Sequence, residues 1–164
     1  MIDTELPPTH FGTVIERRLL VGDHVYLVDE RVHLGLKESG VTHVFDCMDI
    51  GESHELVAKP SYQSPWHVWN TRAFRTSDDG IPKPKWYWHD IIEEARFILS
   101  KPDTAIYVHC WAGLNRGPSA TYAILRAVMG YSAAEAEELI RSVRPEVRLA
   151  YTSNVEEALK ELRR

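Results

Sequence analysis

The sequence predicts an α/β fold: one domain with a central, mostly parallel sheet of four or five strands flanked by helices. Short apolar runs alternate with helical patterns along the chain, which is typical of parallel strands joined by crossover helices. The clearest run, 105–108, leads through a glycine-containing loop into a helical stretch. The 164 residues are 44% hydrophobic and 26% charged, the balance of an ordinary globular domain, here residues 1–164.

The first half of the chain supplies most of the expected strands. Pro7 and Pro8 block regular structure near the N-terminus. Alternating apolar residues indicate strands, and Gly40 is placed to end a helix. The expected elements are an extended lead-in (1–11), one or two edge strands (13–21), a short helix (31–39), a strand (41–46), a long connection (48–65) and a strand (66–70).

The second half is mainly helical around one buried strand. The pattern Ser-x-x-Glu, a capping box that starts a helix, occurs at Ser132–Glu135 and again at Ser153–Glu156. The expected elements are a loop (76–82), a helix (84–100), the strand (105–108), a helix (119–129), a helix from 132 to about 143 and a final amphipathic helix after Ser153.

Composition excludes several classes of function. The net charge of −5 argues against nucleic acid or an anionic membrane as the main partner. No apolar run approaches membrane-spanning length, and the N-terminal sequence lacks the features of a signal peptide, so we expect a cytoplasmic protein. Two cysteines make no disulfide framework, and no His or Cys pair has metal-ligand spacing. We therefore expect no metal and no cofactor.

The segment around Cys110 carries the strongest chemical signal. Cys110 and Arg116 are separated by five residues, between a buried strand and a helix whose first turn suits Pro118. Backbone N–H groups at such a helix start, together with the helix dipole, form a site for a phosphate group. The arginine side chain can bind two phosphate oxygens at once. The same field favours the thiolate form of Cys110, which makes it a candidate nucleophile.

The sequence His-Cys-x-x-Gly-x-x-Arg resembles the signature of the cysteine-dependent protein tyrosine phosphatases, and in a short chain it looks most like their dual-specificity branch. His109, Cys110, Gly113 and Arg116 match the pattern, and the strand opening around Thr42 is similar as well. The resemblance covers roughly residues 13–160. The candidate phosphate-binding residues are Trp111, Ala112, Gly113, Leu114, Asn115 and Arg116.

The resemblance implies a general acid about 30 residues before the cysteine. Asp78 and Asp79 both lie there, in a loop that ends Asp79-Gly80-Ile81-Pro82. Because some subfamilies carry the acid in an Asp-Gly-x-Pro pattern, Asp79 is the expected acid and Asp78 the alternative. A carboxylic acid on a separate loop can protonate the leaving oxygen and then activate water.

Three further residues are implied to support this chemistry. His109 is expected to hold Cys110 by hydrogen bonds. The family usually has Ser or Thr directly after the arginine, whereas this sequence has Gly117, so Ser119 is a candidate for that supporting hydroxyl. Cys47, at the end of the strand 41–46, occupies the place from which a second cysteine in several such phosphatases forms a reversible disulfide with the nucleophile. The alternative is that Cys47 is simply a small buried residue.

The expected activity is hydrolysis of phosphotyrosine, and of phosphoserine or phosphothreonine, in a protein or peptide through a cysteinyl-phosphate intermediate. Because Gly117 lacks the hydroxyl that usually follows the arginine, a phosphate-binding pseudophosphatase is the alternative. Phosphatases for lipid or RNA phosphates share the loop, but they often carry lysine within it, and residues 111–115 contain none. Sulfur transfer is a third alternative, although it usually lacks the upstream aspartate. The sequence gives no prediction of the physiological substrate or the oligomeric state.

Overall fold

The computed structural model describes residues 10–162, and a five-stranded sheet of order β1-β2-β5-β3-β4 lies at its centre. Only β1 runs antiparallel to its neighbour; the other pairings are parallel. The fold class is therefore the predicted one. The strands are β1 (Phe11–Ile15), β2 (Leu19–Gly22), β3 (His43–Asp46), β4 (Asn70–Ala73) and β5 (Ile106–His109).

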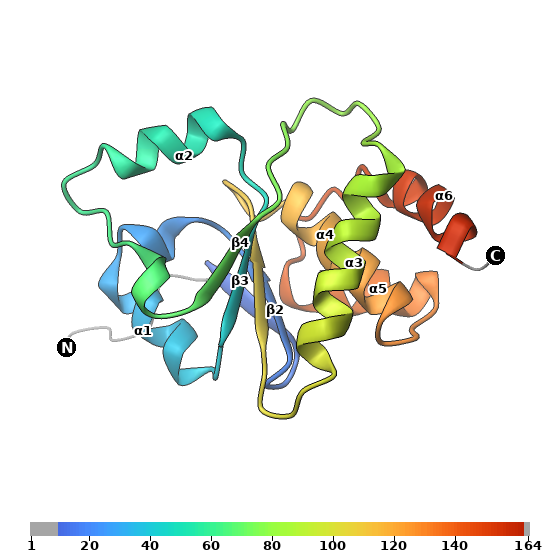
Figure 1. The fold of residues 1–164 in the computed structure, drawn as a ribbon, viewed down its shortest axis with the longest axis horizontal. Coiled ribbons are helices and arrows are strands. Elements are labelled where there is room, and N and C mark those ends of the chain that lie inside the picture. The colour runs from blue at the N-terminus through green and yellow to red at the C-terminus, as the bar shows by residue number, and fades with distance from the viewer. Residues whose placement is uncertain (1–9, 163–164) are drawn as a thin grey trace.

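Helices cover both faces of the sheet (Figure 1). One face carries α1 (Glu30–Glu38) and α2 (Ile50–Val57), with the short 3₁₀ turns η1 (Val25–Leu27) and η2 (Pro65–His67). The other face carries α3 (Lys85–Leu99), α4 (Arg116–Ala127), α5 (Ala133–Val143) and α6 (Thr152–Leu162). Among the described residues, no helix is both long and apolar enough to span a bilayer.

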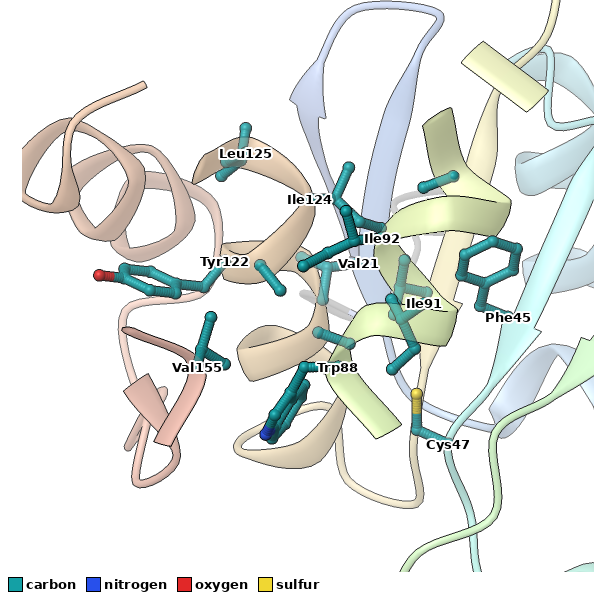
Figure 2. Packing of buried hydrophobic residues seen from close by; sticks show 14 of the residues in the cluster. Val21, Phe45, Cys47, Trp88, Ile91, Ile92, Tyr122, Ile124, Leu125 and Val155 are labelled. Atoms are coloured by element: carbon teal, nitrogen blue, oxygen red, sulfur yellow. The ribbon is translucent and has the colours of Figure 1, made fainter. Parts of the chain in front are cut away.

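The larger hydrophobic core lies between the sheet and the helices α3, α4 and α6 (Figure 2). Trp88 and Ile91 of α3 and Ile124 of α4 are almost fully buried in it. Burying each such side chain stabilises the folded state by about 1.5–3 kcal/mol relative to leaving it exposed to water. This packing fixes α4 against β5, so the loop between them is held at the carboxyl edge of the sheet, where parallel α/β sheets bind their ligands.

Several predicted elements are wrong in detail. The predicted connection 48–65 contains α2, which Asp49 and Glu52 start with a capping box. The predicted strand 66–70 is mostly η2, and β4 begins only at Asn70. The segment 13–21, predicted to form one or two edge strands, contributes to β1 at the edge of the sheet and to β2 inside it.

The helix ends show two more differences. Ser153 lies inside α6, which begins at Thr152, and the carboxylate of Glu156 pairs with Arg126. Helix α4 begins at Arg116, before the expected residue 119. The predicted lead-in lies largely outside the described residues, and Phe11 at its end already belongs to β1.

Candidate active site

The loop between β5 and α4 has the geometry of an anion site. Cys110 follows β5 directly and is 2% exposed, and Arg116 opens α4. Asn115 is the N-cap residue, yet its side chain makes no capping hydrogen bond to the helix. An N-cap side chain normally occupies one of the free N–H groups of the first turn. Here the Asn115 side chain does not occupy them.

Arg144 supports this loop from behind. Its guanidinium donates to the carbonyl oxygens of Ala112 (2.9 Å) and Gly113 (3.3 Å), and its side chain is buried. Because the C=O and N–H of one trans peptide unit point in opposite directions, the N–H groups of Gly113 and Leu114 point away from Arg144. Arg144 thus fixes the orientation of two peptide units. Sequence reasoning missed this residue, which lies 28 positions after Arg116 and has no local signal.

Trp111, the first residue after the cysteine, is fixed by the segment that follows β2. Its indole stacks on the imidazole of His24, with ring centroids 3.9 Å apart. The backbone N–H of His24 donates to the carbonyl of Trp111 (3.3 Å), and His24 Nδ1 lies 2.6 Å from the same oxygen. Trp111 is partly buried, so the loop is held on this side as well as by Arg144.

Arg116 is held by a carboxylate that the sequence analysis did not identify. Arg116 Nη1 and Nη2 donate to Glu52 Oε1 (2.6 Å) and Oε2 (3.0 Å), and Nη1 also reaches the carbonyl of Thr76 (3.0 Å). Such a two-pronged contact fixes the plane of the guanidinium. Arg116 Nε is buried without a hydrogen-bond partner among the described residues. An anion in the loop would supply that partner.

The same carboxylate starts α2, because Glu52 Oε1 accepts the backbone N–H of Asp49 (3.0 Å). Partial burial disfavours its charged form, but the bonds from Arg116 and Asp49 outweigh this effect, so the pKa of Glu52 is lowered. The resulting stabilisation is present at neutral pH. It is lost as the pH falls below 4.5, the ordinary value, and through the lowered pKa. The capping-box pattern Asp49-x-x-Glu52 was the available sequence signal.

We expect Glu52→Gln to lower kcat/KM for aryl phosphates by about 10- to 100-fold, because Arg116 would lose charge-assisted hydrogen bonds worth roughly 1.5–3 kcal/mol. Steady-state kinetics at neutral pH measures this. Glu55→Gln is the matched control, since Glu55 is an exposed residue of the same helix. An equal loss in both variants would show that the effect comes from α2 stability and not from the Arg116 contact.

The structure brings Asp78, rather than Asp79, to the phosphate loop. Asn115 Nδ2 donates to Asp78 Oδ1 (2.7 Å). Asp79 instead accepts from Lys83 Nζ (2.8 Å) and from the backbone N–H of Ile81 (3.0 Å), and its side chain is 43% exposed. These bonds lower the pKa of Asp79, which favours its charged form over the protonated form that a general acid needs. Asp78 therefore contacts the phosphate loop through Asn115, whereas Asp79 contacts Lys83.

The loop that carries both aspartates is fastened at several points. Lys83 is buried, and its Nζ donates to the carbonyl of Ser77 (2.7 Å) as well as to Asp79. The Gly80 N–H donates to the hydroxyl of Tyr151 (2.9 Å), and the Lys83 N–H donates to Asn154 Oδ1 (2.6 Å). The loop is thus attached to α6 and to the residues before it.

Several proteins of known structure share this architecture. No protein-family model matches the sequence, and no curated protein matches it. The structure is similar to that of PTPMT1 in complex with PI(5)P, with a TM-score of 0.76 and 17% identity over 94% of this chain and 97% of that one. It is also similar to the human tyrosine phosphatase-like serine/threonine/tyrosine-interacting protein (TM-score 0.76, 12% identity, 94% and 98% covered) and to human DUSP28 (0.73, 17%, 99% and 100%).

The chain has the fold of the dual-specificity phosphatases. Within that fold, the structure gathers Cys110, Arg116, the loop 111–115 and Asp78 at the carboxyl edge of the sheet. Glu52 and Arg144 join them, whereas Asp79 faces Lys83.

His109 lies at the centre of the dual-specificity phosphatase fold, fully buried beneath Cys110. Its Nδ1 is 3.2 Å from the carbonyl oxygen of Cys110, and its Nε2 is 3.0 Å from the hydroxyl of Tyr26. Burial lowers the pKa of His109, although the Asp46 carboxylate 4.0 Å away opposes this. A neutral ring can donate from Nδ1 to Cys110 and accept at Nε2 from Tyr26. This arrangement fits the expected supporting role.

The main chain around Gly117 leaves little room for a side chain. A Cβ at this position would lie 3.2 Å from the backbone N of Cys110 and equally close to His109, a tight fit against main chain. Ser119 is fully buried, and its Oγ has no hydrogen-bond partner among the described residues. It is two residues further along α4, about 200° around the helix from position 117. Ser119 therefore does not point where the usual Ser or Thr would.

Proposed function

We propose that this protein is a cysteine-dependent phosphatase that hydrolyses phosphate monoesters through a cysteinyl-phosphate intermediate. The observation that carries the proposal is the partnerless, buried Nε of Arg116, held by Glu52 at the start of α4 beside Cys110. A cation fixed at a helix N-terminus is built to receive phosphate oxygens. The two-step chemistry needs no metal and no cofactor.

In the first step, the thiolate of Cys110 attacks phosphorus and the bond to the leaving oxygen breaks. Asp78 protonates that oxygen as it departs. In the second step, Asp78 accepts a proton from water, which attacks phosphorus and releases phosphate and the thiolate. Arg116 and the backbone N–H groups of the loop stabilise the phosphoryl oxygens in both transition states.

Asp78 and Asp79 can be separated by kinetics. We expect Asp78→Asn to slow phenyl phosphate hydrolysis by roughly 10²- to 10⁴-fold, the usual contribution of a general acid, and to remove the fall in kcat at high pH. Asp79→Asn should change kcat by less than about tenfold, because Asp79 contacts Lys83 and not the loop. The assignment would be reversed if Asp79→Asn alone produced the large loss.

For the substrate class we propose phosphotyrosine, together with phosphoserine or phosphothreonine, in proteins or peptides. Multiply phosphorylated lipid headgroups need extra cations, and the arginines around the loop already have partners: Arg75 pairs with Asp46, Arg148 with Asp78, and Arg144 with the loop carbonyls. The similarity to PTPMT1 in complex with PI(5)P makes a lipid phosphate the second candidate. Phosphate release from matched phosphopeptide and phosphoinositide panels decides between them.

A weakly catalytic phosphate-binding protein is the remaining alternative, since Gly117 lacks the usual hydroxyl. The contact between Asp78 and the loop supports a working acid. Hydrolysis of a small aryl phosphate by the wild type, absent in Cys110→Ser, would decide for catalysis.

We also propose that Cys47 is the redox partner of Cys110. Asp46 in β3 pairs with His109 in β5, so the next residues, Cys47 and Cys110, are neighbours. The backbone N–H of Cys47 donates to the carbonyl oxygen of His109 (2.8 Å). Adjacent strands lie about 4.8 Å apart, within the Cα range of disulfides. Both thiols are free. Burial, and then the nearby charges of Cys110 and Asp46, raise the pKa of Cys47, so the thiol should react slowly.

The expected result of mild peroxide treatment is a Cys47–Cys110 disulfide, found by mass spectrometry of unreduced peptides, with activity restored by a thiol reductant. Cys47→Ser should be inactivated without such recovery, because Cys110 would proceed to irreversible oxidation states. If peroxide inactivated the wild type without forming a Cys47–Cys110 disulfide, the proposed redox role of Cys47 would be wrong.

A further inference from the structure

The side chain of Asn115 connects three segments of the site. The residue is 5% exposed, and both ends of its amide are bonded. Oδ1 accepts the backbone N–H of Ala150 (2.7 Å), in the connection between α5 and α6. Because a backbone N–H can only donate, Oδ1 must face Ala150. The NH₂ group must then face Asp78, to which it donates (2.7 Å).

This geometry is unusual for an N-cap asparagine. Such a side chain ordinarily turns back to cap its own helix, which stabilises the helix by about 1 kcal/mol. Asn115 makes no such bond and reaches instead across the loop to another segment. The loop therefore gives up a local stabilising contact, and the side chain gains a fixed donor aimed at a carboxylate.

Resting on the proposed function, we propose that Asn115 is a positioning residue that holds Asp78 over the leaving oxygen of the substrate. The donated hydrogen bond occupies Asp78 Oδ1 and leaves Oδ2 to carry the transferred proton. Other groups face this carboxylate more loosely: the Tyr151 hydroxyl lies 3.4 Å from Oδ1, and Arg148 Nη2 lies 3.7 Å from Oδ2. The charges of Arg116 and Glu52 also act on it. Asn115 thus has two contributions, a backbone N–H in the phosphate loop and a side chain for the acid.

The isosteric variant Asn115→Asp tests this role. The introduced carboxylate can still accept from Ala150, but it cannot donate to Asp78 until it is protonated. We expect it to slow hydrolysis of phenyl phosphate, whose phenol is a poor leaving group, roughly 10²-fold. Hydrolysis of p-nitrophenyl phosphate, which has a better leaving group, should slow only a few-fold. Inhibition by inorganic phosphate should change little. Activity on phenyl phosphate should recover partly at low pH, when the introduced carboxyl can donate.

A double-mutant comparison separates positioning from general damage. If Asn115 acts through Asp78, adding Asn115→Asp to Asp78→Asn should slow phenyl phosphate no further. Asn70→Asp, at an exposed position of β4, controls for the added charge. Should Asn115→Asp fail to fold, Asn115→Ala supplies the same comparison of the two esters.

The possible outcomes differ in what they overturn. An equal slowing of both esters with weaker phosphate inhibition would overturn the inference, because Asn115 would then act only in the phosphate loop. Unchanged hydrolysis of phenyl phosphate by Asn115→Asp would overturn it as well. A wild-type protein that hydrolyses neither ester would overturn the proposed function and this inference together.

Discussion

Replacing Cys110 by serine is expected to abolish hydrolysis of aryl phosphates, a loss of roughly 10⁴- to 10⁶-fold, while inorganic phosphate still binds. Serine keeps the size of the side chain but supplies a hydroxyl instead of the more nucleophilic sulfur. The phosphate contacts come from Arg116 and the peptide groups of the loop, which the substitution leaves in place. Steady-state kinetics and calorimetric titration with phosphate measure the two quantities separately.

Cys47→Ser is the matched control for this prediction. Cys47 is also a buried free thiol, and it directly follows the neighbouring strand β3, as Cys110 follows β5. It should keep its turnover within about tenfold of the wild type, because it forms no bond to the substrate. Equal losses in the two variants would mean that the kinetics report disturbed packing at the strand ends. Residual hydrolysis by Cys110→Ser at the wild-type rate would exclude cysteine as the nucleophile.

Gly113→Ala is the second prediction with a large effect. Gly113 has φ +70°, a conformation that costs a residue with a Cβ about 1–2 kcal/mol. The added Cβ would also lie 2.6 Å from the backbone C of Gly22 and from Arg144 Nη2. Overpacking of this kind costs about 1–3 kcal/mol more. We expect a total destabilisation of roughly 2–5 kcal/mol, seen in urea unfolding.

Activity should fall further than stability alone requires. The loop must shift to relieve these contacts, and a misplacement of about 1 Å in a catalytic group can cost roughly 10²-fold in rate. Gly130→Ala is the control, because Gly130 has φ +77° but no atom within 4 Å of its added Cβ. It should lose only the backbone contribution and keep its activity. If the two variants were equally stable and active, the close contacts around Gly113 would not shape the loop.

The parts of the site that could be predicted are those that one local segment encodes. The strand, the loop and the start of α4 are consecutive, and Cys110, Gly113 and Arg116 take their positions from that single segment. The strands of the sheet could be predicted for a similar reason, because a short apolar run indicates a buried strand from local sequence alone.

The residues that were missed depend on contacts between distant segments. Glu52 and Arg144 reach the loop from 64 and 32 positions away, and no periodicity records such a pairing. Helix α2 was overlooked because its glycine and serine content looked like a connection, although its capping box was present. Which of the adjacent residues Asp78 and Asp79 pairs with Lys83 also depends on the folded chain, and no local sequence pattern indicates it.

The attachments of the aspartate loop have a consequence for the energetics of a catalytic cycle. Lys83, Tyr151 and Asn115 hold the loop through hydrogen bonds within the protein. Loops that fold over a substrate only when it binds lose conformational freedom at every turnover, and their closing motion can limit the rate. The hydrogen bonds of this loop to Tyr151, Asn154 and Asn115 all come from the chain itself, so part of the cost of ordering Asp78 is met when the protein folds.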